Sequence, residues 1–203
     1  MEGGPRMAID PSSFHPVNVT DTCAVWNVLS SRTLYTAARL AGVVFVCTGF
    51  VVYECLFKPR KTETVSDKEL QARLRAAQKE PSFVTYPLDV ADLQTIGILE
   101  SRKRLGKGEL SSIAFALKIR QAFLTDDQKA RRLAREIFGE VPTQTTPHLL
   151  GWLFFGNRLG DADKDAIVKE HAGLGRSLAQ HFEEAYLEAC RCRLMTRHRM
   201  NSA

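Results

Sequence analysis

The sequence predicts an α/β protein of three layers, in which helices cover both faces of a central parallel sheet. Short apolar runs rich in β-branched residues alternate with longer segments of helical periodicity. The intervals between these runs are long enough for a helix to connect parallel strands. The chain has 203 residues, of which 44% are hydrophobic and 25% are charged, so we expect one well-packed domain.

The first predicted elements form two strand-and-helix units. Residues 15–21 read HPVNVTD and predict a short strand, and residues 23–42 carry apolar side chains at helical spacing. The run VVFVCT at 43–48 is continuous and apolar, as in a buried parallel strand. A second helical pattern follows and ends before Pro59.

The alternation continues through the middle of the chain. Residues 66–80 predict a charged helix, in which Ser66 and Glu69 match a capping box, and FVTYPL at 83–88 predicts a strand. The next segments predict two helices, a short strand, a helix and an edge strand, at 89–106, 107–121, 122–125, 126–139 and 141–143.

These elements divide the chain into three parts. Residues 1–14 combine Gly, Pro and Ser without a period and predict a flexible leader, and residues 15–145 form the α/β domain. Residues 146–203 contain three helical segments and no strand signal. We therefore expect a helical C-terminal extension that packs on the domain.

The cysteines and apolar runs predict where the protein resides. Its five cysteines are odd in number and follow no secretory signal, so we expect reduced thiols and a cytoplasmic location. The longest uncharged apolar run, residues 40–53, is shorter than the roughly 20 residues that cross a bilayer. We expect no membrane partner.

Acidic side chains follow several predicted strands. Asp21 ends the first strand, and Asp126 and Asp127 follow the strand at 122–125. Glu54 lies in the helix after the second strand, and Glu109 opens the helix before the fourth. Ligands of parallel sheets bind at the carboxyl ends of the strands, where these acids are expected to meet. Converging carboxylates repel one another unless a divalent cation neutralises them, which favours Mg²⁺ or Mn²⁺ and phosphodiester hydrolysis.

Each acid also has a structural interpretation. Asp21 and one of Asp126 and Asp127 are suited to cap the helices that follow them, and Glu109 complements a helix dipole. Glu54 interrupts the apolar run FVVYECLF, where a structural carboxylate would need a buried partner. This cost favours a functional role for Glu54.

Four segments that contain these acids resemble the motifs of a known family. VTDTCAVWNVLSS, VCTGFVVYECL, GKGELSSIAFALK and FLTDDQKARRLA are similar, in order and spacing, to the four acidic motifs of PIN-domain nucleases, which include VapC-type toxins. The resemblance covers residues 15–141. It implies a three-layer PIN-like fold, RNA cleavage with Mg²⁺ or Mn²⁺, and, for a toxin, an antitoxin partner and a homo-oligomer.

The resemblance also implies roles for individual residues. The catalytic metal ligands would be Asp21, Glu54, Glu109 and Asp127. Asp126 would cap the following helix, although the two neighbours are interchangeable and Asp126 is a further candidate ligand. Asn27 and Thr125 resemble the polar residues that support the acids of this family.

Basic residues flank the predicted site and suit contacts with RNA phosphates. They are Arg102, Lys103, Arg104, Lys107, Arg131 and Arg132. Solvated helix faces explain many runs of this kind, and the net charge of +5 requires no polyanionic partner. The alternative function is a catalytically inactive PIN-like binding module that docks a protein or RNA partner through its C-terminal helices.

Overall fold

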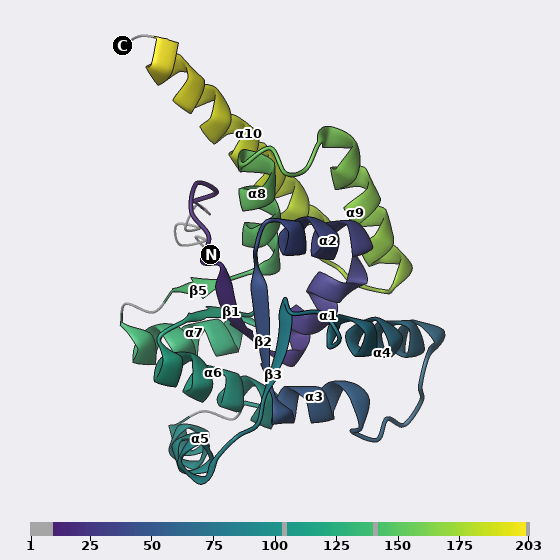
Figure 1. Cartoon of the computed structure of the whole chain (residues 1–203), viewed down its shortest axis with the longest axis vertical. Helices are drawn as coiled ribbons and strands as arrows, with labels where there is room; N and C mark the ends of the chain where they lie inside the picture. The colour runs from purple at the N-terminus through teal and green to yellow at the C-terminus, as the bar shows by residue number, and fades with distance from the viewer. Residues whose placement is uncertain (1–9, 103–104, 140–141, 202–203) are drawn as a thin grey trace, which may run out of the picture.

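The central element of the protein is a five-stranded, fully parallel sheet (Figure 1). The computed structural model describes residues 10–102, 105–139 and 142–201. The strands lie in the order β3-β2-β1-β4-β5, and their bounds are β1 Val17–Thr20, β2 Val44–Thr48, β3 Phe83–Tyr86, β4 Ala122–Leu124 and β5 Thr143–Gln144. The α/β class and the parallel sheet are therefore confirmed.

Ten helices surround the sheet in the described part of the chain. They are α1 Thr22–Ser30, α2 Arg32–Leu40, α3 Gly49–Leu56, α4 Val65–Ala77, α5 Val90–Arg102, α6 Lys107–Ile119, α7 Gln128–Phe138, α8 Thr146–Phe155, α9 Asp161–Gly173 and α10 Ala179–Asn201. Strands and helices alternate as expected up to β5, and helices alone follow it.

Two local predictions were wrong. The single helix expected at 23–42 is broken at Ser31, whose extended backbone and side chain cap α2 by accepting a 3.0 Å hydrogen bond from the Leu34 N–H. The capping box of α4 is formed by Thr64 and Asp67, which accept hydrogen bonds from each other's backbone N–H groups. Ser66 therefore lies inside the helix.

Each face of the sheet covers a separate apolar core. Along β2, Phe45 and Cys47 point to one face, where they pack with α1, α2, α4, α8, α9 and α10. Val46 points to the other face and packs with Val19, Phe123 and the helices α5, α6 and α7. This alternation places helices on both sides of the sheet, as Figure 1 shows.

The order of the strands creates a switch point between β1 and β4. The chain adds β2 and β3 on one side of β1 and then returns to place β4 on its other side. Thr20 lies opposite Cys47 of β2 and Leu124 of β4, so the three strands end at the same level. In open parallel sheets, ligands bind at such a switch point, outside the carboxyl ends of the strands.

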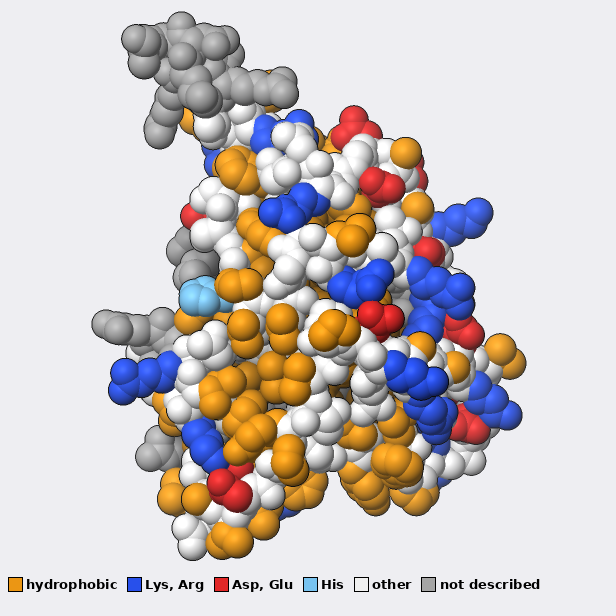
Figure 2. All heavy atoms as spheres, viewed as in Figure 1, with side chains coloured by type: hydrophobic (Ala, Val, Ile, Leu, Met, Phe, Trp, Pro, Cys, Tyr) orange, Lys and Arg blue, Asp and Glu red, His pale blue; other side chains and the backbone are white. Residues whose placement is uncertain are grey.

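An apolar depression of about 390 Å³ lies at the same edge of the sheet, on the side of β3. It is lined by Gly49, Phe50 and Tyr53 of α3 and by Leu88 and Leu93. Figure 2 shows apolar side chains gathered over this lower part of the molecule, where α3 and α5 lie in Figure 1.

The C-terminal helices are part of the core. Leu149, Leu153 and Phe154 of α8 are buried with α1 and α2, and Phe182 of α10 belongs to the same cluster. Phe14, from the segment expected to be a leader, stacks on Trp152 with 5.4 Å between ring centroids. Residues 1–9 of that segment lie outside the described residues.

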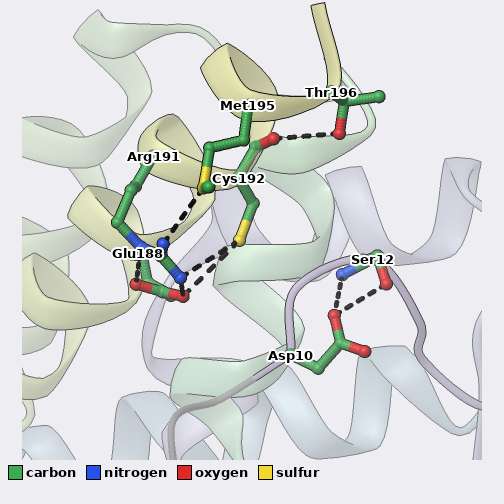
Figure 3. Close-up of polar contacts among 7 residues, drawn as sticks. All are labelled: Asp10, Ser12, Glu188, Arg191, Cys192, Met195 and Thr196. Atoms are coloured by element: carbon green, nitrogen blue, oxygen red, sulfur yellow. Dashed lines mark hydrogen bonds and ion pairs between the residues drawn. The ribbon is translucent and has the colours of Figure 1, made fainter. Parts of the chain in front are cut away.

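The distal part of α10 projects beyond the body of the protein (Figure 1). Here Arg191 donates two hydrogen bonds to the Glu188 carboxylate one turn earlier, and Cys192 also approaches Glu188 (Figure 3). In the described part of the chain, every helix is too short or too polar to span a bilayer.

His171 of α9 makes the stability of this fold dependent on pH. His171 is 1% exposed, and burial lowers the pKa of its imidazole to about 4. Between about pH 6.5 and 4 the unfolded chain binds a proton that the folded chain excludes, so stability falls as pH falls through this window. The full loss is about 3 kcal/mol.

We expect His171→Leu to lose less stability than wild type between about pH 7 and pH 5 in chemical unfolding experiments. His181→Leu is the control, because the His181 side chain is 55% exposed, and its acid response should match wild type. Equal acid responses of His171→Leu and wild type would show that the buried ring is not responsible.

Candidate functional site

Asp21 lies at the carboxyl end of β1 and is completely buried. Its Oδ1 accepts a 2.8 Å hydrogen bond from the Ala24 N–H, which caps α1, and its Oδ2 accepts one from the Thr125 hydroxyl. Burial, with smaller contributions from the charges of Asp126 and Glu109, raises the pKa of Asp21 to about 7, although its two hydrogen bonds act in the opposite direction. The cap explains one oxygen, but it does not explain why other acids lie nearby.

Asp126 and Asp127 follow β4 and bind different helices. Asp127 is the N-cap of α7 and accepts a 2.8 Å hydrogen bond from the Ala130 N–H. Asp126 instead contacts the first residue of α8, because its two oxygens accept hydrogen bonds from the backbone and hydroxyl of Thr146. Asp126 was expected to cap α7, but Asp127 provides this cap. Asn27 donates a further 2.7 Å hydrogen bond to Asp126.

Glu54 projects from α3 toward the start of α6. Its carboxylate accepts a 2.6 Å hydrogen bond from the Thr22 hydroxyl and a 3.2 Å hydrogen bond from the Gly108 N–H. A Cβ atom at Gly108 would lie 2.4 Å from Glu54 Oε2, so glycine is needed for this approach. These contacts supply the partners that a structural carboxylate requires.

Glu109 lies one residue after Gly108, in the first turn of α6. It accepts a 2.7 Å hydrogen bond from the Gly106 N–H, the backbone donor at the N-cap of this helix. Burial raises the pKa of Glu109, and the charges of Asp127 and Glu54 act in the same direction.

Two serines of α6 fix this helix against the strand ends. Ser112 donates a 2.9 Å hydrogen bond to the Thr20 carbonyl of β1, and Ser111 shares a 2.6 Å hydrogen bond with Thr48 of β2. Because these side chains are small and fully buried, α6 lies close to the sheet. Glu109 is thereby held near the end of β1.

The five predicted acids thus form one electrostatic group at the switch point. Asp126 and Glu109 act on Asp21, while Glu54 and Asp127 act on Glu109. Thr125 bonds Asp21 and Asn27 bonds Asp126, as expected of residues that support acids. Among the described residues, no three side chains of His, Cys, Asp or Glu are already grouped so that they could hold one metal ion.

The expected phosphate-binding residues are less well placed. Lys107 pairs with Glu100 at 2.5 Å, while Arg131 and Arg132 lie on α7 beyond Asp127. Lys103, Arg104 and the side chain of Arg102 lie outside the described residues. Lys129, also on α7, is a cation whose charge acts on Glu109. It lowers the pKa of this acid, whereas burial and the neighbouring acids raise it.

Sequence reasoning missed four residues of the site: Thr22, Gly108, Thr146 and Arg176. Arg176 follows α9 and donates a 2.8 Å hydrogen bond to the Asn27 side chain. Gly108 carried a signal, because a glycine beside an acid at a helix start can permit close approach. Thr146 and Arg176 belong to the extension, and their spacing from the acids carries no signal.

Comparisons with protein-family models, with curated proteins and with solved structures gave no match.

The buried carboxylate of Asp21 should reduce stability at neutral and alkaline pH. The folded protein keeps its proton up to about pH 7, whereas the unfolded chain releases it near pH 4, so stability falls as pH rises between these values. Asn can still cap α1 but does not titrate. We expect Asp21→Asn in EDTA to gain stability over wild type as pH rises, by up to about 4 kcal/mol above pH 7.

Chemical unfolding at about pH 5 and pH 8 measures this difference. Asp165→Asn is the control, because the Asp165 side chain is 84% exposed and lies on α9, and its difference from wild type should be nearly the same at both pH values. A less stable Asp21→Asn at both pH values would mean that Asp21 serves as a cap without an electrostatic cost.

Proposed function

We propose that this chain is a PIN-like ribonuclease that hydrolyses RNA phosphodiesters with the help of a divalent metal ion. The observation that carries the proposal is the burial of Asp21 at the switch point, with Glu54, Glu109, Asp126 and Asp127 around it. Caps account for individual hydrogen bonds. They do not account for the concentration of negative charge at the position where parallel sheets bind ligands.

The chemistry of the donor atoms in this cluster suits a hard divalent cation. All of the donors are carboxylate oxygens, which suit Mg²⁺ and Mn²⁺ better than Zn²⁺. Asp21, Glu54, Glu109 and Asp127 would hold the metal, with Asp126 as the further candidate. When bound, the ion would activate water and neutralise charge on the phosphate. A cation would also stabilise the charged forms of Asp21 and Glu109, whose pKa values are raised by burial and, to a smaller extent, by the neighbouring acids.

The protein's own groups would orient the acids. Thr125 donates to Asp21 and accepts from the Asp127 N–H at 3.1 Å, so it joins two of them. Asn27 and Thr146 fix Asp126 from two sides. Thr22 and Gly108 hold the Glu54 carboxylate by hydrogen bonds. Glu54 and Glu109 approach the same point, because a Cβ atom built at Gly106 would lie 3.6 Å from one carboxylate and 3.5 Å from the other.

A second candidate function is a binding module without turnover. Leu187, Leu194 and Met195 are 57%, 61% and 50% exposed on α10, and the end of this helix projects from the body (Figure 1). Exposed apolar side chains of this kind can bind a protein partner, such as an antitoxin. RNA cleavage that depends on a metal ion would support the ribonuclease, and its absence would support the binding module.

We expect the purified protein to cleave labelled single-stranded or structured RNA in the presence of Mg²⁺ or Mn²⁺ and to lose this activity in EDTA. Gel electrophoresis of the products measures cleavage. Asp21→Asn should reduce the rate by at least about a hundredfold if the carboxylate holds the metal, while Asp165→Asn should cleave at the wild-type rate. Cleavage that persists in EDTA, or an inactive wild type, would contradict the proposal.

Gly108→Ala should separate the geometry of the site from the stability of the fold. The added methyl group displaces Glu54, while alanine favours the helix over glycine by about 1 kcal/mol. We expect at least about tenfold slower cleavage with stability equal to or above that of wild type.

Gly97→Ala is the matched control, because a Cβ atom there meets none of the described residues within 4 Å and Gly97 also lies in a helix. It should gain the same helix preference and cleave at the wild-type rate. If Gly108→Ala also cleaves normally, the placement of Glu54 against α6 is not needed for the reaction.

A further inference from the structure

The segment after α9 places Arg176 next to Asn27, which in turn bonds Asp126. Gly175 adopts a left-handed backbone with φ of 69°, and two 3.0 Å hydrogen bonds close the helix end, from the Gly175 N–H to Ala172 and from the Arg176 N–H to His171. This pattern is a Schellman motif. It reverses the chain direction and fixes the backbone from which the Arg176 side chain extends.

One nitrogen of the Arg176 guanidinium group, Nε, forms a hydrogen bond with the site. Its Nε donates a 2.8 Å hydrogen bond to Asn27 Oδ1, so the Asn27 amide nitrogen faces Asp126 and bonds it at 2.7 Å. Nη2 makes a weak 3.9 Å contact with the Cys23 sulfur. Burial raises the pKa of the Cys23 thiol to about 12, and Asp21 and Asp126 contribute, while Arg176 opposes them.

Arg176 is half-buried, and among the described residues it forms no ion pair. Asn27 connects this charge to Asp126, and the guanidinium is not paired to the carboxylate. A planar guanidinium that is held on one side and unpaired on the other can receive two oxygens of a phosphate. The cluster of acids alone would repel such an anion.

We propose that Arg176 binds a phosphate of the RNA strand beside the acids, so that the C-terminal extension supplies the anion-binding group of the site. This inference rests on the proposed ribonuclease function and names a substrate contact within it. The alternative is that Arg176 only holds Asn27 in place. A neutral donor could perform that role equally well.

Arg176→Gln separates the two roles. Glutamine Nε2 is the same number of bonds from Cα as arginine Nε, so it can still donate to Asn27, but it has no charge and no Nη groups. Arg39→Ala is the control, because Arg39 is exposed and pairs with Glu80 at the opposite end of the sheet. Thermal unfolding of each variant verifies that it is folded.

The experiment measures the anisotropy of a fluorescein-labelled single-stranded RNA in EDTA, at several salt concentrations. We expect Arg176→Gln to weaken binding about tenfold at low salt. The slope of log K against log salt should fall by about 0.7, the value for one phosphate contact on a single strand. Arg39→Ala should match wild type in both quantities.

Arg176→Lys provides a second variant, because it keeps the charge but lacks the planar fork. It should retain the wild-type salt slope and bind more weakly. Wild-type affinity and slope in folded Arg176→Gln would overturn the inference and leave Arg176 as a support for Asn27.

Cleavage by the wild type in Mg²⁺, measured in parallel, distinguishes the two proposals. If wild type cleaves RNA and Arg176→Gln binds it normally, the inference fails and the ribonuclease function stands. If wild type neither cleaves nor binds RNA, the proposed function fails and the inference falls with it. Weakened binding by Arg176→Gln, with the lower salt slope, supports the inference.

Discussion

The repulsion among five neighbouring carboxylates is balanced in this protein by the positive ends of four helices. Asp21 caps α1, Asp127 caps α7, Asp126 binds the first turn of α8, and Glu109 accepts a hydrogen bond from the Gly106 N–H at the start of α6. The N–H groups at a helix N-terminus are unpaired and carry partial positive charge. The sheet brings these ends together, because β1 and β4 finish side by side and each leads into a helix.

The close approach of α6 to the sheet depends on small residues. Ser111 and Ser112 reach the ends of β2 and β1, and Gly108 leaves space for the Glu54 carboxylate. Larger side chains here would move α6 outward and separate Glu109 from Asp21. The segment GELSSIAF therefore serves packing and charge placement together, since its serines also supply hydrogen-bond partners to the strand ends.

The sequence predicted those features that depend on local order. The strand runs and the acids that follow them are visible because a strand ends where its apolar run ends, and parallel strands end at one edge. The break at Ser31 was missed because residues 23–42 keep helical periodicity across it, so only the cap geometry marks the end of α1. The sequence predicted the wrong cap for α7, because either Asp126 or Asp127 is suited to this role. Asp126 instead bonds Thr146, which lies twenty positions later in the chain.

Arg176 is a clearer example of a contact that the local sequence does not indicate. Gly175 indicates a helix end from sequence, but nothing local indicates that the next side chain reaches Asn27, which lies 149 positions earlier. The contacts of Thr146 and Arg176 cross the boundary between residues 15–145 and the extension. Asp126 would lose Thr146 as a donor, and Asn27 would lose the group that orients its amide, if the extension were absent. The extension also buries Leu149, Leu153 and Phe154 against α1 and α2, so the same helices that complete one apolar core hold the acids in place. In the part of the chain that the structure describes, only helices follow Thr146, but this change in secondary structure is not a boundary of the site. The hydrogen bonds that form the site join residues on both sides of it.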